Sequence, residues 1–263
     1  MRDSSPQTVL ITGATSGIGR ELALIFAREG YNLHIVARTE QTLNTLTQEL
    51  EQSHHIRCRY TICDLSQPTA AEMLVQEIKK QGEHIDILVN NAGFGNWGRF
   101  DETNLSTEIE EIQLNILSLV KLTKFFVPEM KQRRCGKILN VASTAGFVPG
   151  PYMAIYYATK AFVISFSEAL REEMRGSGIT VSVVCPGETP TNFQKRAGIG
   201  RINLTRKVFM TDSAYVAREA YEGLMGNRAV IIPGMKNKLL MFSRRLLPRI
   251  TVRAIVRWMN IKR

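Results

Sequence analysis

Short apolar runs rich in β-branched residues alternate along the chain with longer stretches in which apolar residues recur at helical spacing. The short runs predict seven strands, at residues 8–12, 32–38, 57–64, 86–90, 137–143, 179–185 and 229–233. The longer stretches predict six helices, at 17–29, 40–52, 69–81, 105–133, 155–175 and 212–225, with Thr39 and either Thr211 or Asp212 as N-caps. Regular alternation is typical of βαβ units, so we predict one doubly wound parallel sheet flanked by helices.

The domain organisation follows from where this pattern stops. No internal repeat, linker or change in composition precedes residue 235, which predicts a single folded domain over 1–235 and a separate tail over 236–263. Residues 187–211 carry no predicted element. Because long structureless segments in compact domains are commonly functional, we predict a lid there.

Composition narrows the class of protein. A hydrophobic content of 44% and a charged content of 22% exclude disordered and collagen-like chains. The four cysteines form no paired motif and no leader precedes the first strand, so we expect a reduced, cytoplasmic protein. The uncharged run 138–159 has the length of a membrane span, but Pro149, Gly150 and Pro151 interrupt it. We interpret it as a buried active-site region.

The net charge of +10 resides in the tail. Residues 1–235 contain 25 Lys and Arg against 24 Asp and Glu, which argues against nucleic acid as a partner, whereas 236–263 contain nine basic residues and no acid. After Pro248 the tail predicts a basic amphipathic helix. Such a helix suits peripheral contact with an anionic membrane, or packing on a partner subunit or on this subunit's own pocket; both interpretations stay open.

A glycine cluster separates the first predicted strand from the first predicted helix. It comprises Gly13, Thr15, Ser16, Gly17, Ile18 and Gly19. Glycines at this position let the backbone approach a pyrophosphate, which the amides at the helix N-terminus stabilise. The alternative is a tight turn without a ligand, since a glycine loop alone is weak evidence.

Two further strand ends favour a particular dinucleotide. The second strand ends at Arg38 rather than at an acidic residue, and an arginine there can pair with the 2′-phosphate of NADP(H). Asp64 and Leu65 follow the third strand, at the edge where an adenine would lie. The competing interpretations are a solvated Arg38 and an Asp64 that only caps the next helix.

The second half of the chain completes an ordered set of motifs. These are Asn91-Ala92-Gly93, Asn115, Ser143, the Tyr156-to-Lys160 pair, and Pro186-Gly187 followed by Thr191. Together with the glycine cluster, they make residues 6–234 resemble the short-chain dehydrogenase/reductases. This resemblance implies a Rossmann-type fold, NADP(H) as cofactor, and a homo-oligomer, either dimer or tetramer.

The expected chemistry centres on Tyr156. Lys160 lies four residues further on, which places its ammonium near the phenol and favours proton exchange closer to neutral pH. Tyr156 is the predicted general acid and Ser143 a hydrogen-bond donor to the developing oxyanion. Tyr157 is a weaker competitor, because the motif matches only Tyr156.

The resemblance assigns further roles. Lys160 would also contact the nicotinamide ribose, Asn115 would help hold a water chain to Lys160, and Thr191 would contact the nicotinamide carboxamide. The four histidines show no ligand spacing, so we predict no metal.

Nearby apolar residues suggest the substrate. We expect the lining to include Phe94, Trp97, Phe100, Phe147, Pro149, Tyr152, Met153 and Phe193. Such a lining suits an apolar ketone or aldehyde, of β-ketoacyl, steroid, terpenoid or xenobiotic type, or the corresponding alcohol. The alternative function is a membrane-associated protein that binds NADPH with little or no turnover.

Overall fold

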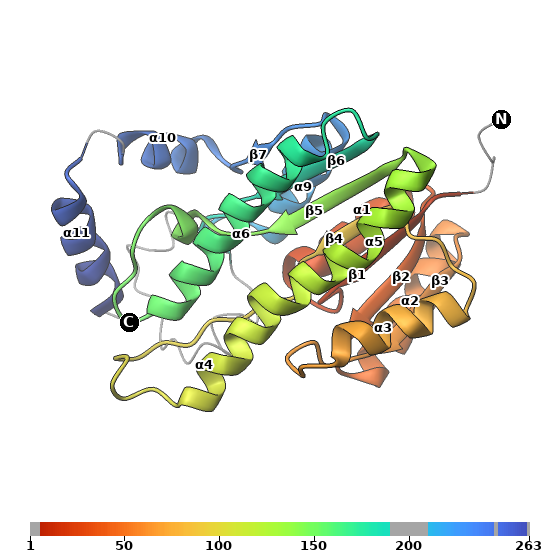
Figure 1. The fold of residues 1–263 in the computed structure, drawn as a ribbon, viewed down its shortest axis with the longest axis horizontal. Coiled ribbons are helices and arrows are strands. Elements are labelled where there is room, and N and C mark those ends of the chain that lie inside the picture. Colours follow the sequence, from red (N-terminus) through yellow and green to blue (C-terminus); the bar gives the residue numbers. More distant parts are fainter. Residues whose placement is uncertain (1–5, 190–209, 245–246, 262–263) are drawn as a thin grey trace.

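Seven strands form one parallel sheet (Figure 1) in the computed structural model, which describes residues 6–189, 210–244 and 247–261. The strands are β1 (Thr8–Thr12), β2 (Asn32–Ala37), β3 (Cys58–Ile62), β4 (Ile87–Asn90), β5 (Gly136–Val141), β6 (Ile179–Val184) and β7 (Val230–Ile231). Their order is β3-β2-β1-β4-β5-β6-β7, so the chain reverses direction across the sheet between β1 and β4. The predicted doubly wound, Rossmann-type sheet is confirmed.

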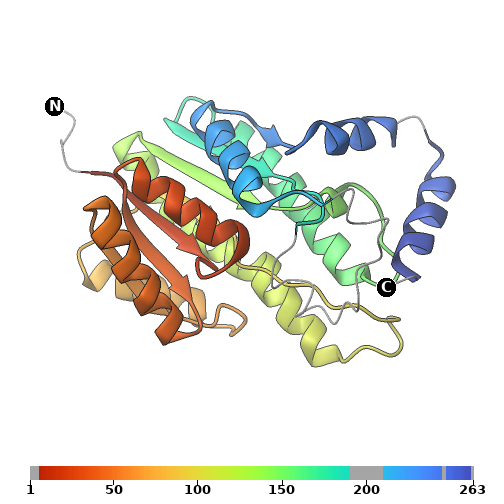
Figure 2. The ribbon, with the colours of Figure 1, turned by 180° about the vertical axis from the view of Figure 1, so that it is seen from behind.

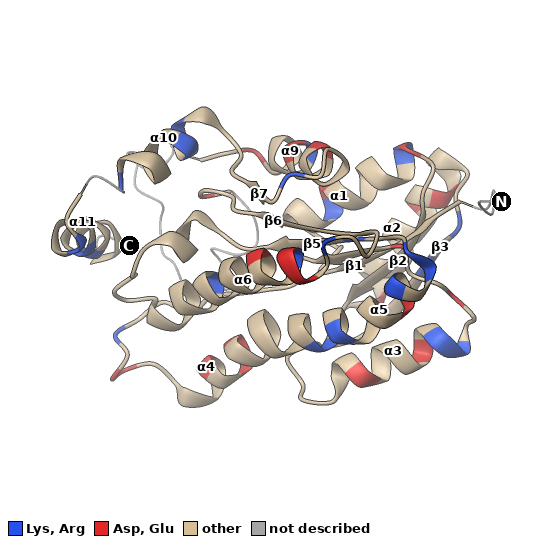
Figure 3. Ribbon diagram, turned by 45° about the horizontal axis from the view of Figure 1, so that its top comes forward, with Lys and Arg blue, Asp and Glu red and all other residues tan. Residues whose placement is uncertain are grey.

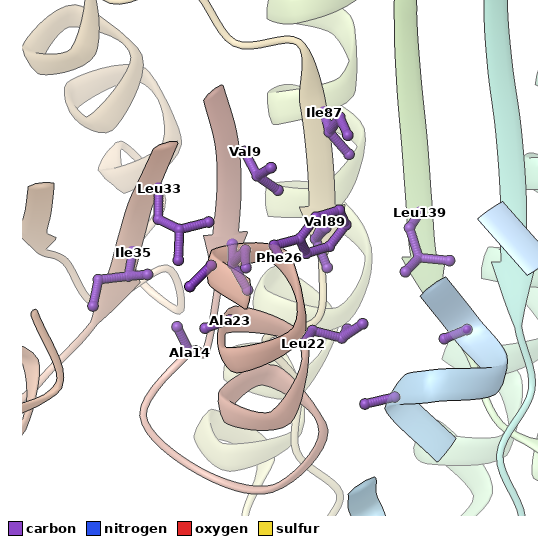
Figure 4. Packing of buried hydrophobic residues seen from close by; sticks show 14 of the residues in the cluster. Val9, Ala14, Leu22, Ala23, Phe26, Leu33, Ile35, Ile87, Val89 and Leu139 are labelled. Carbon is purple, nitrogen blue, oxygen red and sulfur yellow. The ribbon is translucent and has the colours of Figure 1, made fainter. Parts of the chain in front are cut away.

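Helices cover both faces of the sheet. They are α1 (Gly17–Arg28), α2 (Glu40–His54), α3 (Ala70–Lys80), α4 (Leu105–Ile112), α5 (Leu119–Arg133), α6 (Ala154–Glu173) and α9 (Ser213–Met225). Helices α1, α2 and α9 pack on one face (Figure 2), and α3, α5 and α6 on the other. Alternation along β1 explains the two layers, because Val9 and Ile11 belong to the first core and Leu10 to the second. Figure 4 shows Val9 beside Phe26 of α1.

The predicted helix 105–133 is in fact interrupted. A π-helical segment, η1 (Gln113–Ser118), separates α4 from α5 and contains Asn115. A π-helical turn accommodates extra residues without breaking the apolar face, which is why the sequence pattern continues through it. A second short element, the 3-10 helix η2 (Thr144–Phe147), follows β5 and was not predicted either.

Several predicted boundaries agree with the structure. Asp212 is the N-cap of α9, and its carboxylate accepts a hydrogen bond from Tyr215 N at 3.3 Å. Thr39 occupies the N-cap of α2 without a side-chain cap bond. Most of the predicted lid, residues 190–209, lies outside the described residues, as do Thr191 and Phe193.

The tail forms two helices, α10 (Met235–Ser243) and α11 (Arg249–Ile261), beyond the β7 edge of the sheet (Figure 1). Basic residues mark both helices in Figure 3. The start of α10 is joined to the core, because Asn237 Nδ2 donates to Pro233 O at 2.8 Å. Within the described residues, no helix combines the length and hydropathy needed to cross a bilayer.

Candidate functional site

The glycine cluster forms an open cradle at the N-terminus of α1. Gly13 and Gly17 have φ angles of +66° and +54°, which favour glycine. A Cβ atom on Gly19 would lie 2.3 Å from Gly13 O and 2.4 Å from Asn91 Nδ2, so this position admits no side chain. The backbone can therefore approach a ligand closely in front of the free helix amides, which fits a pyrophosphate.

Asn91 links this cradle to the neighbouring strand. Its Nδ2 donates to Thr12 O at 2.9 Å and to Gly13 O at 3.1 Å. The backbone amides of Asn91 and Ala92 both donate to Thr12 Oγ1 at 3.0 Å. The Asn91 side chain thus fixes the shape of the glycine loop from across the point where the strand order reverses.

A single cavity of about 1040 Å³ connects the cradle with the other motifs at the carboxyl ends of the strands. The predicted residues that line it are Gly13, Thr15, Ser16, Gly17, Ile18, Arg38, Asp64, Leu65, Asn91, Ala92, Gly93, Ser143, Tyr156, Lys160, Pro186 and Gly187. Gly19 and Asn115 lie behind this surface and support it. The cavity is large enough for a dinucleotide and a small substrate.

The end of β2 presents a cation to the cavity. Arg38 is exposed, and no carboxylate stands beside it on β2, which ends at Ala37. Asp64 also lines the cavity, but its Oδ1 accepts hydrogen bonds from Ser66 N at 3.1 Å and Ser66 Oγ at 2.7 Å. Asp64 therefore shapes the local turn as well as facing the cavity. The exposed Arg38 guanidinium fits a dinucleotide with a 2′-phosphate.

Tyr156 and Lys160 lie together on α6. Lys160 Nζ is 5.8 Å from the centroid of the Tyr156 ring and donates to Val141 O at 2.9 Å. Burial lowers the pKa of the Lys160 ammonium to about 8. Tyr157 also lines the cavity, but its hydroxyl accepts a hydrogen bond from Asn260 Nδ2 of α11 at 3.5 Å. The geometry therefore favours Tyr156 over Tyr157 as the partner of Lys160.

Ser143 occupies the N-cap of η2. Its Oγ accepts from Ala145 N at 3.1 Å and donates to Pro186 O at 3.4 Å. The second bond is long, so the hydroxyl proton can turn to a stronger acceptor in the cavity. The cap bond holds the oxygen in place during such a rotation.

Asn115 fixes the loop after β4 against α6. Its Oδ1 accepts from Phe94 N at 3.1 Å, and its Nδ2 donates to Phe94 O at 2.8 Å and Thr159 Oγ1 at 3.1 Å. A Cβ on Gly93 would lie 2.9 Å from Asn115 Oδ1 and 3.4 Å from Lys160 Nζ. The side chain therefore lies immediately behind the lysine, and its expected water-holding role stays a prediction.

Sequence reasoning missed Glu111, which lies fully buried one helical turn before Asn115. Its Oε2 accepts from Asn96 N at 3.0 Å, and its Oε1 has no hydrogen-bond partner among the described residues. Burial raises the pKa of Glu111 to about 8, and its charge in turn favours the charged form of Lys160. The signal was an acidic residue at an inward-facing position of the helix, four positions before a motif asparagine.

The substrate end of the cavity differs from the predicted aromatic lining. The tail supplies its aliphatic wall, namely Leu240, Met241, Leu247, Val252, Ile255, Val256 and Met259. Among the predicted lining residues that the structure describes, Met153 lines the cavity and the aromatics do not. Trp97 instead stacks on Tyr152 at 6.0 Å and donates through Nε1 to Asn260 O at 3.1 Å. These loop aromatics pack on one another and hold α11 in place.

The fold and this cavity define a dinucleotide-binding α/β oxidoreductase. Residues 7–201 match the family model for short chain dehydrogenases. The 17-beta-hydroxysteroid dehydrogenase type 3 of Rattus norvegicus is 34% identical over 213 residues, which are 80% of this chain and 69% of that protein. Dehydrogenase/reductase SDR family member 7B of Bos taurus is 35% identical over 195 residues, 72% of this chain and 60% of that protein.

A solved structure supports the same family. A short-chain dehydrogenase from Sphingobium yanoikuyae in complex with NADPH is 33% identical, with a TM-score of 0.81 over 91% of this chain and 93% of that one. The chain belongs to the short-chain dehydrogenase/reductase family, whose members are NAD(P)(H)-dependent oxidoreductases acting on CH–OH or C=O groups. The predicted family is confirmed.

Proposed function

We propose that this protein uses NADPH to reduce an apolar ketone or aldehyde to the alcohol. The observation that carries the proposal is the single cavity, which joins the glycine cradle and Arg38 at one end to an aliphatic wall at the other. Tyr156, Lys160 and Ser143 line the same cavity. An apolar carbonyl compound suits such a wall better than a sugar does.

The residues around the cavity divide the work of the reaction. The glycine cradle and Arg38 would hold NADPH, which would supply the hydride when bound. Tyr156 donates the proton to the carbonyl oxygen, and Ser143 stabilises the charge that develops there. Lys160 keeps a positive charge beside Tyr156, and this charge favours release of the phenol proton. Pro186 and Gly187, together with Thr191, are the proposed contacts of the nicotinamide.

Lys160 and Glu111 give the reaction a defined pH dependence. Because the lowered pKa of Lys160 is about 8, its charge is present below that pH and lost above it. We expect kcat/KM for carbonyl reduction to be level at lower pH and to fall as the pH rises through about 8. Glu111→Gln removes the negative charge that raises the pKa of Lys160. The pKa of Lys160 should therefore be lower in this variant, and kcat/KM should begin to fall at lower pH.

The pH profile of kcat/KM tests this expectation. Glu110→Gln is the matched control, because Glu110 is exposed on the same helix and should leave the profile unchanged. An unchanged profile in Glu111→Gln would contradict the proposed coupling between the two buried groups.

Arg38 is the proposed determinant of NADPH over NADH. Its guanidinium can pair with the 2′-phosphate, and the NADPH-bound Sphingobium relative supports the same choice. Arg38→Asp should lower the preference for NADPH by roughly 10- to 100-fold, the usual cost of losing a charge-assisted pair. Steady-state kinetics with both cofactors measure it, and an unchanged preference would contradict this assignment.

Loss of NADPH absorbance over a panel of β-ketoacyl thioesters, steroid ketones, terpenoid ketones and aromatic aldehydes tests the proposed activity. Turnover of at least one class is expected. Stoichiometric NADPH binding without turnover of any compound would instead favour the alternative function, a binding protein with little or no activity.

We propose further that the outer side of the tail lies on an anionic membrane surface, with the catalytic domain in the reducing cytoplasm. While one side of α11 lines the cavity, Ile250 and Ile261 on its other side are 68% and 46% exposed. Leu239 and Phe242 of α10 are 67% and 61% exposed. The absence of any acid in 236–263 gives this apolar surface a positive charge that complements anionic lipid.

Vesicle sedimentation tests the membrane proposal. A double variant, Arg253→Glu with Arg257→Glu, should bind vesicles containing anionic phosphatidylglycerol at least roughly tenfold less tightly, at about 1 kcal/mol per charge. Arg218→Glu with Arg228→Glu, two exposed positions outside the tail, makes the same change in net charge and should bind as the unmodified chain does. Equal sedimentation of the double variant would contradict the proposal, as would equal binding to neutral vesicles by the unmodified chain.

We also propose a homo-oligomer. Leu105 and Ile109 of α4 are exposed, as are Phe125 of α5 and Phe162 of α6, so apolar side chains gather on the outer surface of these helices. Sedimentation velocity should give a dimer or tetramer, and a monomer at all concentrations would contradict this.

A further inference from the structure

Arg244 brings a guanidinium to the substrate end of the cavity, where no described carboxylate forms an ion pair with it. It follows α10 directly and lines the same cavity as Ser143 and Tyr156. The guanidinium contacts Phe147: Nη1 donates to the carbonyl oxygen, and the guanidinium carbon lies 5.2 Å from the ring centroid. The Nε atom is buried and has no hydrogen-bond partner in the part of the chain that the structure describes.

No ion pair within the described residues involves Arg244. Two acids line the same cavity, but Asp64 bonds Ser66 at the β3 end, and Glu188 follows Gly187 after β6. Of the neighbours of Arg244 in the chain that line the cavity, Ser243 is polar, and Leu240, Met241 and Leu247 are aliphatic. A partly buried cation with an unsatisfied donor in such surroundings is stabilised when an anion binds.

The position of Arg244 relative to Ser143 sets the length of the ligand. Phe147, which holds the guanidinium, ends the 3-10 helix that starts directly after Ser143. Four residues at the rise of a 3-10 helix span roughly 8 Å. An anion on Arg244 would therefore lie several bonds from a carbonyl that is hydrogen-bonded to Ser143.

We propose that Arg244 binds a carboxylate at the far end of the substrate, so that the substrate is a ketone or aldehyde with an apolar body and a terminal acid. This inference rests on the proposed reductase function for its carbonyl end. One guanidinium carries one positive charge and matches a monoanion in two parallel hydrogen bonds. A phosphate dianion would leave net negative charge in an aliphatic cavity, so a carboxylate fits better.

Two pairs of probes test the assignment. They are 4-acetylbenzoate and 7-oxooctanoate, each compared with its neutral methyl ester at saturating NADPH. The unmodified chain should reduce the acids with higher kcat/KM than the esters. Arg244→Met should lower kcat/KM for the acids by roughly 10- to 100-fold and leave the esters within about twofold. Arg244→Lys should retain part of the preference, because it keeps the charge.

The control is Arg218→Met, which removes the same charge from an exposed position on α9 and should change neither substrate class. Equal losses for acid and ester in Arg244→Met would overturn the proposal, because they would assign Arg244 to packing α10 against η2 alone. The absence of any preference for acids in the unmodified chain would overturn it too.

A binding measurement separates this inference from the proposed reaction. Calorimetry of each acid with the NADP⁺ complex does not depend on turnover. Binding that is lost in Arg244→Met would support the carboxylate site even if no probe were reduced, in which case only the proposed activity would fail. Equal affinity of both proteins for the acids, or no affinity in either, would overturn the carboxylate site.

Discussion

Tyr156→Phe should lower kcat for carbonyl reduction by roughly 10²- to 10⁴-fold, the usual contribution of a positioned general acid. The Tyr156 ring lies beside the buried ammonium in the cavity, with Lys160 Nζ 5.8 Å from the ring centroid. The substitution removes one oxygen and leaves the ring, so the cavity keeps its shape. NADPH affinity, measured by fluorescence titration, should therefore change little.

Tyr157→Phe is the matched control, because it removes a phenol oxygen from the adjacent residue. That oxygen contacts Asn260 Nδ2 at 3.5 Å, and its loss should cost less than about tenfold, since the bond is long. Full activity in Tyr156→Phe, or a larger loss in Tyr157→Phe, would contradict the assignment of the proton donor.

Gly19→Ala should weaken NADPH binding by at least roughly tenfold and destabilise the fold by about 1–3 kcal/mol, as overpacking does. The added Cβ would lie 2.3 Å from Gly13 O and 2.4 Å from Asn91 Nδ2. Relief of this clash requires α1 to move away from the loop, because Gly13 O belongs to the backbone. The helix amides would then leave the position from which they contact a pyrophosphate.

Cofactor titration and urea unfolding measure the two effects of Gly19→Ala. Gly30→Ala is the control, because Gly30 has φ +80° with nothing within 4 Å of its added Cβ and precedes β2 at the opposite edge of the sheet. It should lose stability through backbone strain and keep its NADPH affinity. Unweakened NADPH binding in Gly19→Ala would contradict the cradle.

The doubly wound parallel sheet and the position of the site could be predicted from the sequence for a physical reason. Strands buried on both faces, such as β1, are continuous apolar runs, and helices between them keep one apolar side. Parallel strands bring their carboxyl ends to one edge, so residues that follow separate strands, such as Gly13, Asn91 and Ser143, line one cavity.

Features that depend on tertiary packing could not be predicted. The π-helical segment around Asn115 leaves the apolar pattern of its helix intact, so the sequence indicates one unbroken helix. The aromatics after β4 and β5 were assigned to the substrate, yet Trp97 and Tyr152 stack on each other. The aliphatic wall comes instead from α10, from α11 and from Leu247 between them, in the tail of the chain.

The amphipathic pattern of α11 also allowed two interpretations that the structure partly separates. Val252 and Val256 line this subunit's own cavity, which confirms the predicted packing on its own pocket. Asn260, which is fully buried, donates to Pro151 O at 2.8 Å and fixes the end of the helix. Contact of the opposite side with a membrane stays a prediction, because an exposed apolar surface does not by itself identify what covers it.

Hydride transfer is the central claim, and its most direct test is NADPH deuterated at the transferring position. Incubation with the panel of ketones and aldehydes, followed by mass spectrometry of the products, should find one deuterium on the carbinol carbon of the alcohol. Tyr156→Phe should bind the same cofactor and form little labelled alcohol. Saturable NADPH binding with no labelled alcohol from any substrate would contradict the account.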